Sequence, residues 1–117
     1  MNKLMLLSAV MISLCASCAS FPIPNDQKAA SEAAYRGAQE AGADAAPQAR
    51  LAMQLSLDEN AQANQAIQNG DNRRAAALFN RARADAELAV GLSRQAQMDL
   101  AAQQEAQTVA SLRNPAP

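Results

Sequence analysis

The sequence predicts an all-α protein, an alanine-rich antiparallel helical hairpin extended to a three-helix bundle with a long C-terminal helix. From Cys18 onward the chain holds 28 alanines against 17 residues drawn from Val, Ile, Leu, Met, Phe and Tyr. Small and apolar residues recur at helical spacing on both sides of Asn69-Gly70-Asp71, a sequence typical of a turn between helices. Because alanine favours helices and lets their backbones approach closely, we expect a thin core between long helices.

Residues 1–17 have the pattern of a bacterial signal peptide. Lys3 supplies the positive start, and an apolar run follows from Leu4 to Leu14. This run of 11 residues is shorter than the roughly 20 that a bilayer-spanning helix needs. We therefore expect this segment to be removed.

The stretch from Leu14 to Cys18 resembles the bacterial lipobox, in which small residues precede a cysteine that becomes the lipidated first residue. The resemblance implies lipidation of Cys18, although Cys15 stands where the lipobox prefers an aliphatic residue. Cleavage after Ala19 or Ser20, giving a soluble periplasmic protein, is the alternative. Because neither of these two residues is the Asp that retains enteric lipoproteins in the inner membrane, the resemblance implies the outer membrane.

Residues 18–25 are predicted to form the lipid anchor and a proline-containing tether, followed by a helical domain over residues 26–113. The first helix is expected to begin with Asn25 or Asp26 as its cap and to end near Ala41, with Gly42 as terminator. Glu, Arg and Glu at positions 32, 36 and 40 predict an i,i+4 ladder of charges. We expect Tyr35 to pack its ring with the hydroxyl at the surface, in preference to contacting a ligand.

The second helix is predicted from Pro47 to Asn69, with Asp44 as a possible cap. One stripe of this helix holds small or apolar residues and one amide: Ala49, Met53, Ser56, Asn60, Ala63 and Ile67. Asn60 is expected at the boundary of the core with its amide in water. Three leucines lie off the stripe, at positions 51, 55 and 57; if the first helix does not cover them, they indicate a surface for a partner.

The third helix is predicted from Asp71 to about Leu112, with residues 114–117 as a disordered tail. Two i,i+4 ion pairs are expected, Arg81 with Asp85 and Arg83 with Glu87. Together with Arg73 and Arg74, these arginines indicate a solvated surface in preference to a phosphate site. The short loop near residues 43–46 favours a first helix folded back as part of a bundle, with a collinear pair of helices as the alternative.

Several segments together resemble the domain of unknown function 4398 family of small bacterial envelope lipoproteins. The resemblance covers roughly residues 29–102 and rests on Ala-Gly-Ala before Ala46-Pro47, on Gly70-Asp71, and on the alanine and leucine spacing from Ala75 to Ala89. It departs from the family pattern at Asn60. The family has no established activity, so the resemblance implies a location and no functional residues.

The composition argues against catalysis. The chain has no His, its two Cys lie in the leader region, and Asp58-Glu59 are neighbours that diverge by about 100° on a helix. We therefore expect no enzyme activity, catalytic residue, cofactor or metal site. The near-balanced charge predicts no binding to nucleic acid, and no small-molecule substrate is expected.

The leading hypothesis is a non-enzymatic outer-membrane lipoprotein with a small periplasmic helical module for protein interaction or structure. Its expected partners are the membrane, through the N-terminal lipid, and another envelope protein or a second copy of itself. The alternative is a soluble periplasmic helical adaptor or chaperone-like protein without lipidation.

Overall fold

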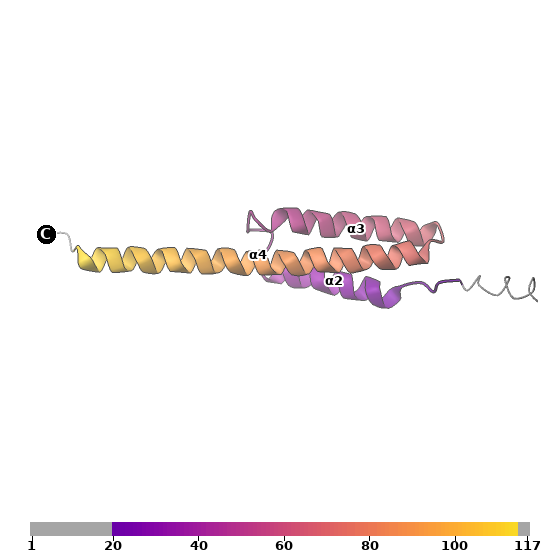
Figure 1. The fold of residues 1–117 in the computed structure, drawn as a ribbon, viewed down its shortest axis with the longest axis horizontal. Coiled ribbons are helices and arrows are strands. Elements are labelled where there is room, and N and C mark those ends of the chain that lie inside the picture. The colour runs from indigo at the N-terminus through magenta and orange to yellow at the C-terminus, as the bar shows by residue number, and fades with distance from the viewer. Residues whose placement is uncertain (1–19, 115–117) are drawn as a thin grey trace, which may run out of the picture.

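The computed structural model describes residues 20–114 and folds them into three α-helices without a strand (Figure 1). These are α2 (Asn25–Glu40), α3 (Arg50–Gln68) and α4 (Asn72–Arg113). α2 and α3 run along different sides of α4 and contact it extensively, whereas they contact each other little. The predicted all-α bundle with a long C-terminal helix is confirmed, and the collinear arrangement of the first two helices is excluded.

The turn between α3 and α4 forms as its residues predict. Gly70 takes a φ of 76°, and its amide donates to the Ile67 carbonyl at 2.9 Å. The Asp71 amide donates to the Ala66 carbonyl at 2.9 Å, while the Asp71 carboxylate accepts from the Arg74 amide at 3.1 Å. One residue therefore closes α3 and caps α4, which forces the two helices to run antiparallel.

The connection between α2 and α3 is longer than the sequence predicts. Gly42 ends α2 with a φ of 77°, as expected. The chain then makes successive three-residue turns, with hydrogen bonds from Ala46 to the Ala43 carbonyl at 3.2 Å and from Ala49 to the Ala46 carbonyl at 2.9 Å. These turns bury all three alanines against the bundle. The predicted start of the second helix at Pro47 is therefore wrong by three residues, because burial of this loop delays regular helix until Arg50.

The start of α2 also differs from the prediction. Neither Asn25 nor Asp26 caps the helix; both lie within it, and Pro24 is the capping residue without a side-chain bond. The buried Pro24 presents its carbonyl to the Lys28 amide at 3.0 Å. Proline suits this position because its φ is fixed near the helical value.

The core consists of two groups of small side chains on either side of a polar layer. One group joins the end of α2, the buried loop, the start of α3 and the middle of α4, and is almost wholly alanine with Met53 as its largest buried member. The other lies near the α3–α4 turn and surrounds Phe79, which is fully buried against Leu78 and three alanines. Methyl groups bury little area, at roughly 25 cal/mol per Å², so the single buried aromatic ring contributes heavily to stability.

The C-terminal half of α4 extends beyond the other helices (Figure 1). The helix has 42 residues, which gives a length of about 63 Å. From Gln97 to Asn114 every residue is exposed. This extension continues a helix that the bundle has already nucleated, so each further alanine or glutamine adds a hydrogen bond without the cost of a new nucleus.

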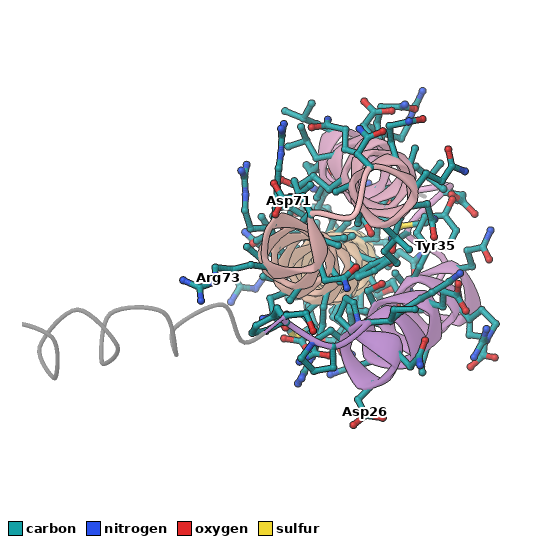
Figure 2. All side chains as sticks on the ribbon, turned by 90° about the vertical axis from the view of Figure 1, so that its right-hand side faces the viewer. Asp26, Tyr35, Asp71 and Arg73 are labelled. Atoms are coloured by element: carbon teal, nitrogen blue, oxygen red, sulfur yellow. The ribbon has the colours of Figure 1, made fainter. Side chains whose placement is uncertain are left out.

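The segment before α2 lies against the start of α4. The Asn72 side-chain amide donates to the Phe21 carbonyl at 2.7 Å, and the Arg73 guanidinium lies 5.9 Å from the centre of the Phe21 ring. Viewed along the bundle, the labelled Arg73 and Asp26 point away from the helices (Figure 2). The predicted signal peptide over residues 1–17, Cys18 and most of the predicted tail lie outside the described residues.

Replacing Phe79 with alanine tests the thin core. We expect Phe79→Ala to lower the free energy of unfolding by about 3–5 kcal/mol, because the substitution leaves a cavity among short alanine side chains that do not reach into it. Leu100→Ala is the control, since Leu100 is exposed, and its effect should stay within about 0.5 kcal/mol. Urea unfolding followed by circular dichroism measures both. Equal effects for the two variants would contradict the described core.

Candidate functional site

A polar layer crosses the middle of the bundle, between the two groups of small side chains. Ser31 of α2 is fully buried, and its hydroxyl donates to the Asn60 side-chain oxygen of α3 at 2.5 Å. The Asn60 amide nitrogen in turn donates to the Ser56 carbonyl at 2.9 Å. Asn60 is half-buried at the boundary of the core, as expected, and its amide group makes both of these hydrogen bonds within the protein. The layer links α2 to α3, which otherwise contact each other little.

Glu59 is the one strongly buried charged residue of this layer. Its side chain is only 6% exposed, and its Oε1 atom lies 2.7 Å from Nη2 of Arg81, whose side chain is 72% exposed. The other carboxylate oxygen, Oε2, is buried without a hydrogen-bond partner. The pair therefore joins α3 to α4 through a carboxylate that has lost most of its hydration.

Burial raises the pKa of Glu59 above its ordinary value, and the neighbouring Asp85 carboxylate raises it further. The positive charge of Arg81 acts in the opposite direction and does not outweigh the first two causes. A protonated Glu59 is able to donate a hydrogen bond to Asp85, and this bond contributes to the rise in the pKa.

Perturbed carboxylates also occur in active sites, where they have access to a substrate. Glu59 is 4% exposed and faces a neighbouring helix, so a substrate does not reach it in this conformation. The adjacent Asp58 points outward and accepts a hydrogen bond from Gln54 at 2.9 Å. Asp58 is exposed and Glu59 is buried, so the two neighbouring carboxylates diverge, as their adjacent positions on a helix predict.

The structure changes the predicted pattern of ion pairs. Arg83 pairs with Glu87 at 2.7 Å, as expected. The partner of Arg81 is Glu59 of α3, so the predicted pair with Asp85 is wrong. Within residues 20–114 the predicted ladder on α2 does not form either, because these exposed side chains gain little from pairing in water.

Tyr35 packs its ring against the group of small side chains around Met53. Burial raises the pKa of Tyr35, and the negative charge of Asp44 adds to this. The packing of the ring is as expected, and the raised pKa shows that the hydroxyl has lost part of its hydration.

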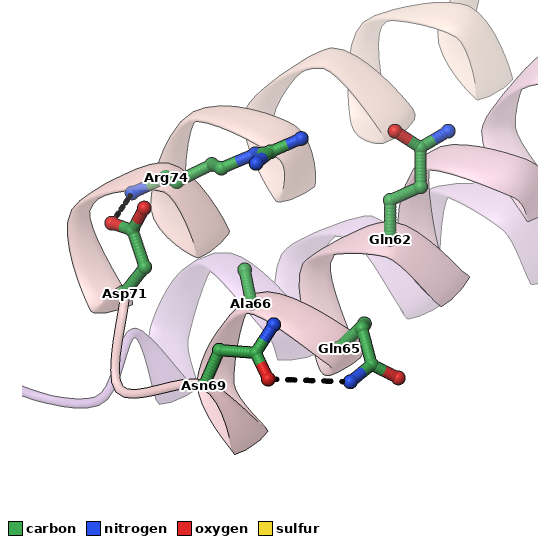
Figure 3. A pocket seen from close by; sticks show the side chains of 6 residues that line it. All are labelled: Gln62, Gln65, Ala66, Asn69, Asp71 and Arg74. Carbon is green, nitrogen blue, oxygen red and sulfur yellow. Dashed lines mark hydrogen bonds between the residues drawn. The ribbon is translucent and has the colours of Figure 1, made fainter.

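A shallow hollow of about 170 Å³ lies at the α3–α4 turn (Figure 3). It is lined by Gln62, Gln65, Ala66, Asn69, Asp71 and Arg74. The Asp71 carboxylate is occupied by the cap of α4, and Gln65 donates to Asn69 at 3.4 Å. The hollow is smaller than the roughly 300–1,000 Å³ of typical ligand sites and has no nucleophile beside a base.

The outer side of α3 carries the leucines that were expected to mark a partner surface if uncovered. Leu51 is 68% exposed, Leu55 is 41% exposed and Leu57 is 44% exposed. α2 lies along α4 and does not cover them. Leu51 and Leu55 are four residues apart and share a face of the helix, so together they form an exposed apolar patch.

Comparison with protein-family models, with curated proteins and with solved structures finds no match. Over the described part of the chain, three or more Cys, Asp or Glu side chains never come together as a metal would require. The helices of residues 20–114 include none with both the length and the apolar character needed to cross a bilayer. Cys18 lies outside this range, and no catalytic, cofactor or metal residue was predicted.

The raised pKa of Glu59 leads to a prediction about pH. Because the folded protein holds this proton to a higher pH than the unfolded chain, the native state binds more protons between the two pKa values. The contribution of Glu59 to stability is therefore greatest below about pH 4, and it falls as the pH rises through the higher pKa of the folded state. Glu59→Gln keeps the shape of the side chain and removes its titration, so we expect the melting temperature of this variant to rise relative to that of the wild type as the pH increases above about 4.

Asp58→Asn is the control for this experiment, because it removes an exposed carboxylate from the adjacent position of α3. Thermal unfolding across the pH range gives the difference for each variant. A Glu59→Gln protein that loses stability relative to the wild type as the pH rises would show that the ion pair with Arg81 dominates.

Proposed function

We propose that this chain is a non-enzymatic outer-membrane lipoprotein whose helical module makes protein contacts in the periplasm. Anchoring rests on the small residues before Cys18, since acyl chains on that residue would hold the protein to a membrane at about 0.8 kcal/mol per buried methylene. The outer membrane follows from the absence of Asp at the two positions after it. The proposed resemblance to the domain of unknown function 4398 family is consistent with a lipid-anchored envelope protein, but the proposal does not depend on it.

The observation that carries the interaction role is the amount of apolar surface left outside the core. The bundle buries mainly alanine, with Met53, Leu78 and Phe79 as the larger buried side chains, whereas most of its other large apolar side chains are exposed on α3 and along α4. Side chains of this size contribute most when another surface covers them. Their placement on rigid helices, away from the buried layer, suits contact with another protein better than chemistry on a small molecule.

A soluble periplasmic adaptor without lipidation is the second candidate. It has the same helical module and differs at the processing site, where cleavage after Ala19 or Ser20 would release the protein from the membrane. The short Phe21 segment supports either arrangement, because it lies against α4 and begins directly after the processing region. The two candidates therefore differ in covalent chemistry at one residue.

Labelling with radioactive palmitate distinguishes them. We expect the full-length chain expressed in bacteria to incorporate label and to sediment with outer membranes, and Cys18→Ser to abolish both. Cys15→Ser is the matched control and should retain the label, because Cys15 lies in the segment to be removed. Label that persists in Cys18→Ser, or a wild-type protein released with the periplasm, would overturn the anchored form.

Crosslinking in intact cells, followed by mass spectrometry of the captured complexes, tests the interaction role. We expect crosslinks from exposed positions of α3 or α4 to another envelope protein or to a second copy. A chain that yields none at either helix would overturn this role, irrespective of the palmitate result.

A further inference from the structure

The outward face of α4 carries a second stripe of residues, at alternating spacings of three and four. This outer stripe consists of Leu88, Gly91, Gln95, Met98, Ala102, Glu105, Val109 and Leu112, all of them exposed. The exposed fractions are 53% for Leu88, 66% for Met98, 49% for Val109 and 77% for Leu112. An average spacing of 3.5 residues is the period with which helices pair in coiled coils.

Within residues 20–114, neither packing nor backbone conformation requires a glycine at position 91 of this stripe. It lies inside a helix, it is not among the glycines with positive φ, and a Cβ atom placed on it would meet nothing within 4 Å. A glycine here is less favourable than alanine by about 1 kcal/mol. The lack of a side chain becomes useful only where another molecule approaches the backbone.

We propose that the outer stripe pairs with the same stripe of a second copy, with the two α4 helices antiparallel. One register matches the stripe to itself throughout. Leu112 of one copy faces Leu88 of the other, Val109 faces Gly91, Met98 faces Ala102, and Glu105 faces Gln95. Two layers set a larger apolar side chain against a smaller residue, and the polar residues meet in one layer. By two-fold symmetry every layer occurs twice.

Charge and size both favour the antiparallel direction. A parallel pair would set Gly91 against Gly91 and Ala102 against Ala102, leaving two gaps, and would place Glu105 against Glu105 within the seam. The parallel pair would, in return, place Arg94 of one copy near Asp99 of the other, which is a favourable contact between opposite charges. In the antiparallel register, Arg94 lies level with Glu105 of the other copy. The two copies of Asp99 approach each other in this register, but they do so at the rim, where water screens the repulsion.

The size of the interface indicates weak, reversible pairing. From Leu88 to Leu112 the stripe is about 36 Å long and about 10 Å wide, so two copies bury roughly 700–800 Å². This is below the area of a stable soluble dimer. The inference therefore deepens the proposed function and rests on it, because attachment to one membrane would raise the local concentration of the copies.

Single cysteines introduced into the full-length chain test the direction of pairing in intact cells, with a short bifunctional maleimide as crosslinker. In the proposed register, the two copies of residue 101 lie within about 3 Å of each other along the axis, whereas the copies of residue 109 lie about 27 Å apart. We expect Ala101→Cys to give a product of twice the monomer mass and Val109→Cys to give none above background. The wild type, which carries Cys15 and Cys18, sets that background.

Further substitutions in the Ala101→Cys chain test the stripe itself. Met98→Asp should lower the crosslinked fraction at least about fivefold, because it places a charge in the seam opposite Ala102. Gln107→Asp is the matched control on the other side of α4 and should leave the fraction unchanged. Asp99→Asn should raise the fraction roughly twofold by removing the like-charge contact. An increase of this kind is not expected from damage to the fold.

Three outcomes would overturn the proposal: no crosslink from Ala101→Cys above background, a stronger crosslink from Val109→Cys, or equal loss with Met98→Asp and Gln107→Asp. Palmitate labelling of the same strains distinguishes a failure of the pairing proposal from a failure of the proposed lipid anchor. Labelled chains that do not crosslink reject the pairing alone, whereas crosslinked chains without label reject the anchor alone.

Discussion

The structure depends on close approach of the helices to α4, which is possible because most of the side chains that α4 presents to them are small; Leu78 and Phe79, near the α3–α4 turn, are the buried exceptions. Ala75, Ala82, Ala86, Ala89 and Ser93 are all buried along one face of this helix. Larger residues there would push α2 and α3 outward, since interaxial distances depend on the side chains at the contact. The same choice limits stability, because methyl groups bury little area. Specific polar contacts therefore matter more than in a leucine-rich bundle.

Those polar contacts set the register of the three helices. Ser31 bonds to Asn60 between α2 and α3, and Glu59 pairs with Arg81 between α3 and α4. At the C-terminal end of α2, the Ser93 hydroxyl of α4 donates to the Ala41 carbonyl at 2.6 Å. This bond supplies a partner for one of the carbonyls that the end of a helix leaves without an intrahelical donor. Alanine faces look alike at every turn, whereas a hydrogen bond or ion pair forms in one register only. The buried charge is thus a means of specificity even where it adds little stability.

Local signals in the sequence predict the helices and the α3–α4 turn well. Gly70 and Asp71 need only their own backbone and neighbours to form the turn, so their roles follow from residue type. The start of α3 was not predictable in this way, because burial of Ala43, Ala46 and Ala49 depends on contact with α4. The burial of Glu59 was predictable from its position, because it lies three residues after Ser56 and four residues before Ala63 and so shares their side of the helix. Its partner Arg81 lies on another helix, which local spacing does not identify.

Hydrogen exchange along α4 tests most directly the claim that this helix is the common support of the bundle. In dilute protein, where copies do not pair, we expect strong protection from Ala75 to Ser93, with the same opening free energy as α3, and weak protection beyond Gln97. Such a profile follows if packing of small side chains, and not intrinsic helix propensity, holds the structure together. Uniform protection along all of α4, or protection of α4 without α3, would contradict the account.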